Sequence, residues 1–395
     1  MNAESSNQPD GPHAWLVAAT GAVAMVFTFG TPLSYGIFRG PFGEAFGISP
    51  LALSAVFAIM LSTLYIGSGL VGIFGVRFPA RGVLVVCAIA TGAIAPALYL
   101  VDSLVGLGLV FAVLGLALGT VFVLVASVVP RWFENRRGAA TGLIFTGNGL
   151  GLFVLPPIWQ FALSEWGVRR GFFAVMSVTA GAFLLAAVIC HRPRWAEHAT
   201  ATTDELLTWL TRLGRTRSFQ LLFVGIALSF AWYQLVAAYA VDLFVARGLS
   251  AAGASTAFGL IGGVSIVSRI GGGYLGDWMG SRRAYLASLG CTAVGVALLF
   301  VPASTTLFGA VMLIGLGLGG TATLYIPLIM GQYPTEMDTA VVGVFNVAGG
   351  IAALMMPPLG TVSVAYTDGF TLSIVLTLVL IVTGLWTTAG GTRGK

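Results

Sequence analysis

The sequence is poor in charged residues. Only 8% of its 395 residues are Asp, Glu, Lys or Arg, whereas 57% are hydrophobic; an average soluble domain is about 25% charged. A water-soluble chain could not cover so much apolar surface with so few charges. The shortage of charge therefore excludes an ordinary soluble domain. With a mean hydropathy of +0.95, the chain is suited to a lipid bilayer.

Cysteine and histidine are also scarce, with three residues of each. Cys87, Cys190 and Cys291 fall in or beside apolar stretches, where cysteine is typically a small buried hydrophobe. We therefore expect no disulfide framework and no metal site. The sequence contains no Walker loop and no Ser/His/Asp arrangement, and no histidine lies deep in an apolar stretch. We expect neither an enzyme nor an ATP-driven pump, and no bound cofactor.

Long apolar runs fill most of the chain. A helix of about 20 apolar residues crosses a bilayer, and the runs predict 12 spans. The 54 glycines suit such helices, because small residues let helix backbones approach closely in membranes. The predicted spans lie near 14–38, 51–75, 82–101, 104–130, 138–163, 171–190, 219–245, 252–276, 284–302, 305–332, 339–363 and 370–389.

Basic residues are distributed unevenly between these spans. If both termini lie in the cytoplasm, the inward-facing set is Arg77, Arg81, Arg131, Arg136, Arg137, Arg192, Arg194, Arg212, Arg215, Arg217, Arg282, Arg283, Arg393 and Lys395. The outward-facing set is only Arg39, Arg169, Arg170 and Arg247. This bias predicts a multi-pass protein of the cell (plasma or inner) membrane with cytoplasmic termini. It also explains the net charge of +5 without a nucleic-acid partner.

The chain matches itself after a shift of 201 residues, without a gap. Matched pairs include Ser54 and Ser255, Phe57 and Phe258, Gly72 and Gly273, Gly119 and Gly320, and Pro156 and Pro357. Single matches are common in glycine-rich apolar sequence, but a constant offset over five elements indicates two similar halves. Parallel repeats with a substrate site between them near the membrane midplane are a transporter architecture.

A polar stretch at 191–218 separates the two halves. Its leucines, spaced along one helix face, predict a short amphipathic helix; they are Leu206, Leu207, Leu210 and Leu213. We therefore predict an all-α polytopic protein with two pseudo-symmetric six-helix bundles, at 1–190 and 219–395. Residues 191–218 are predicted to be a cytoplasmic linker.

The segment Gly273-Tyr-Leu-Gly-Asp277-Trp-Met-Gly280-Ser-Arg282-Arg283 follows the eighth predicted span. Gly273 and Gly280 would allow a tight turn, and Asp277 could accept from helix-end amides or pair with an arginine to latch one conformation. An ordinary charged loop is the alternative. The segment resembles the signature of the major facilitator superfamily. That resemblance implies a 12-helix transporter fold and gating roles for Asp277, Arg282 and Arg283.

Two further segments resemble signatures of the monocarboxylate transporter family, as in a prokaryotic member related to oxalate/formate-type carriers. Asp10-Gly-Pro-His-Ala-Trp15 opens the first span, and Trp132-Phe-Glu-Asn-Arg136-Arg137-Gly-Ala-Ala-Thr-Gly opens the fifth. The resemblance implies gating roles for Asp10, Trp15, Arg136 and Arg137. The residues alone also allow plainer roles. Asp10 could complement a helix dipole, and the two arginines could simply satisfy the charge bias of the loops.

Arg269 lies within the eighth predicted span. A charge deep in the membrane is costly and needs a partner or a water-filled cavity, and no acid lies at comparable depth in any predicted span. Arginine stays charged and can bind a carboxylate with two hydrogen bonds. We therefore expect Arg269 to bind an anionic substrate, as the family resemblance also implies. Snorkelling to the headgroups and pairing with Asp277 are the alternatives.

Other residues within the spans are candidates to line the site. Ser265 is one turn before Arg269 and could contact the substrate, but its hydroxyl cannot carry a proton. The polar or aromatic candidates from other spans are Phe122, Asn148, Tyr233, Tyr325 and Asn346. Each could instead be a helix-packing contact. Leu33 occupies a position where animal members of the family carry a lysine.

The family resemblance and the single intramembrane arginine favour a secondary transporter for a small monocarboxylate such as lactate or pyruvate. We expect alternating access with proton symport, and a carrier that functions as a monomer in the lipid bilayer. The alternatives are an organic-anion exchanger and a carrier that exports hydrophobic drugs. Neutral or cationic cargo and little effect of losing Arg269 would indicate the drug carrier.

Overall fold

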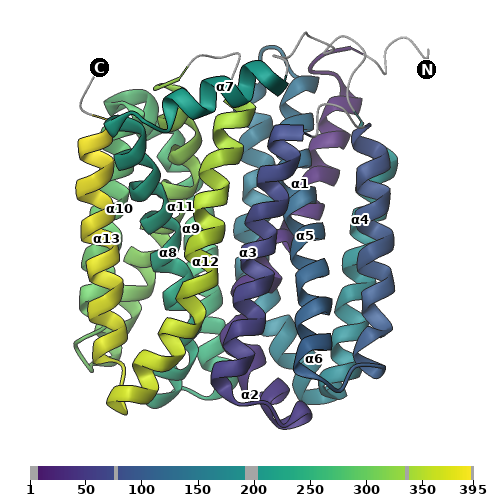
Figure 1. Cartoon of the computed structure of the whole chain (residues 1–395). Helices are drawn as coiled ribbons and strands as arrows, with labels where there is room; N and C mark the ends of the chain where they lie inside the picture. The colour runs from purple at the N-terminus through teal and green to yellow at the C-terminus, as the bar shows by residue number, and fades with distance from the viewer. Residues whose placement is uncertain (1–7, 75–78, 192–202, 334–337, 393–395) are drawn as a thin grey trace.

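The computed structural model of the chain describes residues 8–74, 79–191, 203–333 and 338–392. The side chains of 72–74, 137–139, 203–207, 277, 304–305 and 338–340 lie outside this description. Within the described residues the chain forms α-helices and short 3-10 turns, with no strand (Figure 1). The all-α fold predicted from the sequence is confirmed.

The first half of the chain forms one bundle of helices. Its elements are α1 (Pro12–Leu33), α2 (Tyr35–Phe46), α3 (Pro50–Phe74), α4 (Ala80–Ile94), η3 (Ala95–Tyr99), α5 (Leu104–Val128), η4 (Val129–Trp132) and α6 (Arg137–Ile189). Helix α6 is two helices in one run, because Gly167 adopts φ 73° and ψ 170°. Glycine alone adopts such a backbone at little cost, so the predicted fifth and sixth spans are joined there.

The second half forms the other bundle, preceded by a short helix. Its elements are α7 (Thr203–Leu213), α8 (Arg217–Ala246), α9 (Ala251–Met279), α10 (Ser281–Leu298), α11 (Ser304–Met330), α12 (Asp338–Thr367) and α13 (Thr371–Gly391). Among the described residues, 10 helices are long and apolar enough to cross a membrane. Because α6 contains two passages and α10 supplies another, the fold has the 12 predicted spans.

Two boundaries differ from the sequence prediction. The first predicted span is broken at Ser34, where α1 ends and α2 begins. Pro32 cannot donate a backbone hydrogen bond, which weakens the helix there. The segment from Gly273 is helical as far as Met279, and the turn is made at Gly280 with φ 85°. The eighth span, predicted to end near 276, therefore extends to Met279, because glycine is tolerated inside a membrane helix.

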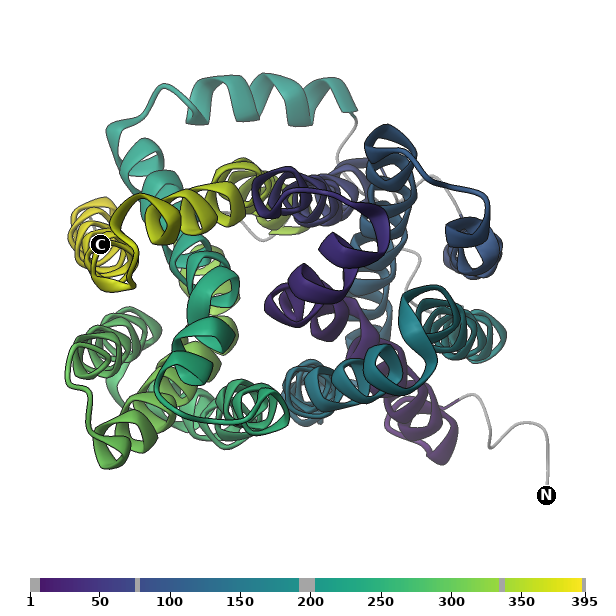
Figure 2. The ribbon, with the colours of Figure 1, turned by 90° about the horizontal axis from the view of Figure 1, so that it is seen from below.

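The two bundles meet along two helix pairs. Helix α3 packs along α12, and α6 packs along α9, as the view along the helices shows (Figure 2). Both α7 and the last described residues lie at one end of the molecule, here called the α7 end (Figure 1). Helix α2 lies at the opposite end, here called the α2 end. The halves are also joined at the α2 end, where Arg39 of α2 forms a salt bridge with Asp242 of α8.

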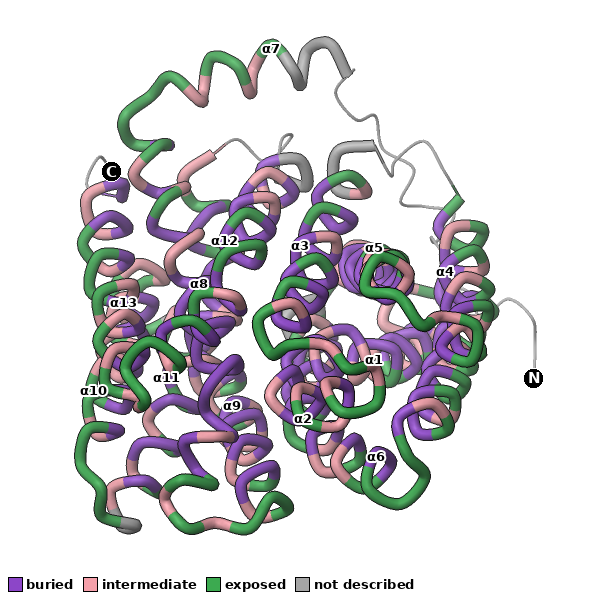
Figure 3. The backbone as a smooth tube through the Cα atoms, turned by 60° about the horizontal axis from the view of Figure 1, so that its bottom comes forward, coloured by how far each residue is buried: buried purple, intermediate pink, exposed green. Residues whose placement is uncertain are grey.

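The outer surface is apolar, as a lipid-facing surface must be. Large hydrophobic side chains are exposed on several outer helices, including Val86 and Ile89 on α4 and Phe308 on α11. Exposed residues alternate with buried ones along these helices (Figure 3), so each helix turns one face inward and one outward. This pattern agrees with a protein embedded in a bilayer.

The predicted linker contains the predicted helix. Helix α7 lies across the ends of the membrane helices rather than along them (Figure 1). Its Trp209 ring is 6.2 Å from the ring of Tyr333, which follows α11. The side chains of Leu206 and Leu207 and all of 192–202 lie outside the described residues, so the prediction for 191–218 is described only from Thr203 onward.

Candidate functional site

A cavity lies between the two bundles. Its walls come from α1, α3, α5 and α6 of the first half and from α8 to α12 of the second. Six of the predicted site residues line it, each from a different helix: Phe122, Asn148, Tyr233, Arg269, Tyr325 and Asn346. Residues far apart in the sequence therefore meet at one place.

Arg269 is buried in the wall of this cavity. Its side chain is only 7% exposed, and its Nε has no hydrogen-bond partner among the described residues. Helix α9 continues from Arg269 to Met279, which places Arg269 about 15 Å from the helix end. This placement argues against snorkelling. The side chain of Asp277, the alternative partner, lies outside the described residues, but its backbone is about 12 Å along the helix axis from Arg269.

The cavity wall contains no compensating acid in the part of the chain that the structure describes; its lining has no Asp, Glu or His. Gly149 of α6 packs closely against α9, since a methyl group there would lie 2.7 Å from Ile266 Cγ1. A buried cation beside a cavity, with an open donor, can bind an anion with charge-assisted hydrogen bonds. A planar guanidinium suits a carboxylate in particular.

Ser265 does not line the cavity. It is fully buried, and its hydroxyl donates to the carbonyl oxygen of Gly262 at 2.7 Å. Its backbone faces α11, where a methyl group on Gly319 would lie 2.2 Å from the Ser265 carbonyl oxygen. Ser265 is therefore not among the residues that line the cavity in this structure, and its contact with the substrate stays a prediction.

The second half supplies further polar groups to the cavity. Tyr233 Oη on α8 and Asn346 Nδ2 on α12 are buried without hydrogen-bond partners among the described residues. Buried polar groups are usually paired, so these atoms are open positions for a polar ligand. Asn148 of the first half differs, because its Oδ1 accepts a hydrogen bond from the Thr28 hydroxyl at 2.8 Å. Asn148 thus also has the helix-packing role given as its alternative.

Aromatic rings form much of the remaining wall. Phe122 is 5.1 Å from Phe29 and 6.1 Å from Phe145, measured between ring centroids. Sequence reasoning missed several lining residues: Phe29, Tyr65, Phe145, Phe230, Gln234 and Tyr285. Aromatic residues occur on all faces of apolar spans, so their sequence positions do not distinguish the cavity from the lipid surface.

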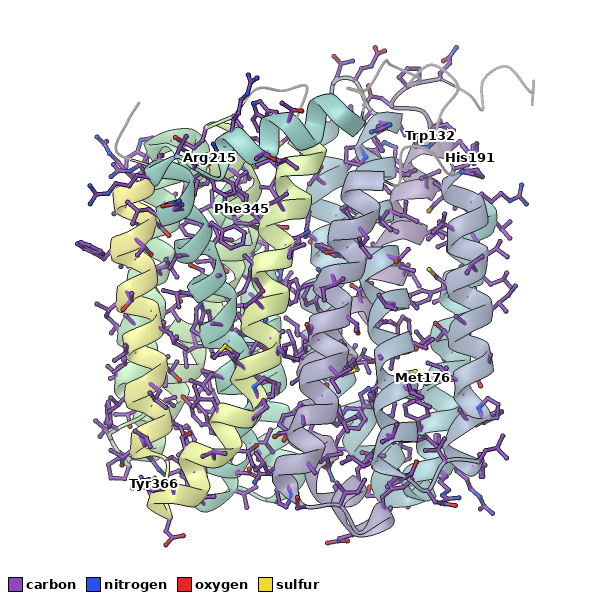
Figure 4. All side chains as sticks on the ribbon, in the orientation of Figure 1. Trp132, Met176, His191, Arg215, Phe345 and Tyr366 are labelled. Carbon is purple, nitrogen blue, oxygen red and sulfur yellow. The ribbon has the colours of Figure 1, made fainter. Side chains whose placement is uncertain are left out.

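The two segments that resemble monocarboxylate-transporter signatures pack against each other at the α7 end. The Trp15 and Phe133 rings are 5.0 Å apart, and Asp10 N donates to the Trp132 carbonyl oxygen at 3.0 Å. Trp132 Nε1 also donates to the carbonyl oxygen of His191 at 2.7 Å, and these two residues lie side by side in Figure 4. The segments join the start of α1 to the start of α6 within the first half.

The Asp10 carboxylate binds the turn before α6. It accepts hydrogen bonds from three backbone N–H groups, with N···O distances of 3.3 Å for Glu134, 3.1 Å for Asn135 and 3.2 Å for Arg136. The backbone hydrogen bond from Asn135, followed by the other amides, lowers the pKa of Asp10 below its usual value. Arg136 is exposed, and the side chain of Arg137 lies outside the described residues. The gating roles of Asp10, Trp15, Arg136 and Arg137 stay predictions.

We expect Asp10→Ala to lower the melting temperature slightly at neutral pH, by no more than about 2 °C because the carboxylate is exposed. Because the pKa of Asp10 is lower in the folded state than in the unfolded state, the carboxylate stabilises the fold at pH values above the unfolded-state pKa of about 4. This contribution is lost as the pH falls through the folded-state pKa. The difference between the proteins should shrink below about pH 4. Asp10→Asn is the control, since it can keep one acceptor and the φ of 60°. A difference that grows in acid would contradict this role.

The charged residues after Gly280 have separate positions. Arg282 Nε donates to the Thr392 hydroxyl at 2.8 Å, and its Nη2 donates to the Ala389 carbonyl oxygen at 3.2 Å. Arg282 therefore ties the start of α10 to the end of α13 within the second half. Arg283 is exposed, and the gating roles predicted for Asp277, Arg282 and Arg283 stay predictions.

Two bundles of apolar helices with a cavity between them are the architecture of a membrane transporter. The family model of the Major Facilitator Superfamily matches residues 16–357. The chain belongs to this superfamily. The resemblance to its signature at Gly273–Arg283 is thus confirmed at the level of the superfamily.

Relatives at lower identity bear on the second resemblance. Human monocarboxylate transporter 11 is 27% identical over 412 residues, covering 97% of this chain and 84% of the relative. Bovine monocarboxylate transporter 13 is 25% identical over 391 residues, covering 95% and 88%. The uncharacterized transporter YcxA of Bacillus subtilis is 22% identical over 365 residues, covering 88% of each chain. The chain is thus related to proteins named monocarboxylate transporters.

Solved structures share the fold. A variant of the peptide transporter POT in complex with sulfate superposes with a TM-score of 0.75 at 14% identity, covering 98% of this chain and 96% of that one. A D-xylose–proton symporter superposes with a TM-score of 0.68 at 17% identity, covering 96% and 98%. At these identities the similarity establishes the fold alone.

Proposed function

We propose that this chain is a secondary transporter that carries small monocarboxylates, of the lactate and pyruvate kind, across the cell membrane by alternating access. The observation that carries the proposal is Arg269, a buried cation in the cavity wall whose Nε has no partner among the described residues. A bound carboxylate neutralises the guanidinium, so the loaded carrier can reorient without an unpaired buried charge. The relatives named monocarboxylate transporters also support this class of cargo.

The coupling mode has two candidates. Proton symport is our proposal from the family resemblance, with the proton compensating the charge of the cargo. Anion exchange is the second candidate. It is favoured by the cavity lining, which has no Asp, Glu or His to carry a proton in the described part of the chain. We further propose a monomer in the plasma or inner membrane, with the α7 end and both termini in the cytoplasm, as the arginine distribution favours.

Uptake of labelled lactate and pyruvate into proteoliposomes tests the function. Symport predicts faster uptake when the outside is acid, and exchange predicts dependence on an internal carboxylate at any pH. Uptake of neutral or cationic drugs with no carboxylate transport would overturn the proposal. It would instead support the drug-export alternative.

Alternating access predicts that the Arg39–Asp242 salt bridge affects the transport rate. Arg39→Asp places two acids together at the α2 end. Their repulsion raises the free energy of the conformation in which the two halves are joined at that end. Since each cycle passes through that state, we expect uptake to slow about fivefold, equivalent to about 1 kcal/mol. The double exchange Arg39→Asp with Asp242→Arg should restore uptake to within about twofold. A double variant as slow as the single one would show that the pair has no role in closure.

A further inference from the structure

The two walls of the cavity differ in chemistry. Three polar atoms in the wall lack hydrogen-bond partners among the described residues and belong to the second half: Arg269 Nε, Tyr233 Oη and Asn346 Nδ2. The opposite wall, from the first half, consists mainly of Phe29, Phe122 and Phe145 with leucines. A ligand spanning this cavity therefore meets a cation on one side and aromatic rings on the other.

The aromatic wall continues across the boundary between the halves. The Phe29 and Tyr65 rings are 5.9 Å apart, and Tyr65 is 5.3 Å from Phe230 of α8. Phe230 is in turn 5.4 Å from Tyr325 of α11. Rings that meet edge-to-face favour another ring in the same arrangement. The wall thus offers contacts suited to a flat apolar group.

The extent of the aromatic wall supports the same conclusion. A three-carbon acid with its carboxylate at Arg269 would leave much of this wall without contact, whereas a ring attached to the acid would reach it.

We propose that the preferred cargo of this carrier is an aryl-substituted monocarboxylate, bound with its carboxylate at Arg269 and its ring against Phe29, Phe122 and Phe145. This inference rests on the proposed function and narrows its substrate class. The cargo carries no ammonium group, because the described lining contains no acid to pair with one. Arylacetates, arylpropionates and arylpyruvates fit, whereas aromatic amino acids do not.

Uptake by proteoliposomes of the full-length protein tests this assignment. The labelled compounds are 3-phenylpropionate, phenylpyruvate, lactate, pyruvate and phenylalanine. We expect KM for the aryl acids to be at least about tenfold below KM for lactate, because their rings bury apolar surface. Phenylalanine uptake should stay at background. An equal or lower KM for lactate, or saturable uptake of phenylalanine, would overturn the aryl-acid assignment.

Phe145→Leu separates ring recognition from carboxylate binding. We expect it to raise KM for aryl acids about fivefold and to leave KM for lactate within about twofold. Phe173→Leu is the matched control on α6, because Phe173 is 44% exposed on the outer surface. Equal effects of Phe145→Leu on both classes of acid would refute the proposed ring site. Loss of all carboxylate transport from the unmodified protein would instead refute the proposed function itself.

Discussion

Arg269→Met is expected to abolish saturable carboxylate uptake while making the folded protein more stable. The arginine can give the carboxylate two charge-assisted hydrogen bonds, each contributing about 1.5–3 kcal/mol. Losing both corresponds to a decrease of about 100-fold or more in kcat/KM. Arg269→Lys keeps the charge but not the planar pair of donors, so we expect an intermediate loss of about tenfold.

The gain in stability follows from the same burial. Arg269 is 7% exposed, and its Nε lacks a partner among the described residues. Replacing a buried, poorly compensated charge by an apolar side chain of similar length is often stabilising by about 1–4 kcal/mol. We therefore expect the melting temperature of Arg269→Met in detergent to rise by at least about 2 °C.

Arg170→Met is the control for these two measurements, since Arg170 is exposed on α6. It should change neither uptake nor the melting temperature. Undiminished uptake by Arg269→Met would refute the site assignment. A lower melting temperature with no uptake would show that Arg269 has a structural partner, and transport measurements alone could not reveal this.

Gly151→Ala is expected to destabilise the first bundle severely. A methyl group at Gly151 would lie 1.9 Å from the carbonyl oxygen of Val26 and 2.7 Å from its carbonyl carbon. These are backbone atoms of α1, so they cannot rotate away as a side chain could. Separating α1 from α6 also disturbs the nearby contact at Gly147, where a methyl group would lie 2.1 Å from the Ala22 oxygen. Overpacking costs about 1–3 kcal/mol and can cost more.

Gly142→Ala on the same helix is the matched control. No atom lies within 4 Å of a methyl group placed there, and alanine favours a helix over glycine by about 1 kcal/mol. We expect the melting temperature in detergent to fall by at least about 3 °C for Gly151→Ala and to stay equal or rise for Gly142→Ala. Equal melting temperatures for the two variants would show that α1 and α6 separate without cost.

The sequence was a good guide where one physical property dominated. Apolar length predicted the spans, and the gap at residues 164–170 anticipated the reversal at Gly167. Arg269 was conspicuous because a charge is rare in a span. Phe145 and Phe161 had no such signal, although one lines the cavity and the other is 55% exposed on the outer surface. Only the packing of neighbouring helices determines which face of α6 each one occupies.

The internal repeat predicted the two bundles but could not predict the detail of their inner surfaces. The counterpart of Arg269 in the first half is Ser68, shifted by 201 residues. Ser68 is buried, and its hydroxyl donates to the Tyr65 carbonyl oxygen at 2.9 Å. The same repeat position therefore carries a buried cation in the cavity wall in one half and a locally hydrogen-bonded hydroxyl in the other.

The cation and most of the phenylalanine wall belong to different bundles, so the proposed carboxylate site and the proposed ring site are expected to change independently. Substitutions at Phe29, Phe122 or Phe145 should change which substituent on the acid fits the cavity, while the proposed contact between Arg269 and the carboxylate is unchanged. A chimera that joins this second half to a first half with another lining should therefore keep the carboxylate site and change its substrate preference.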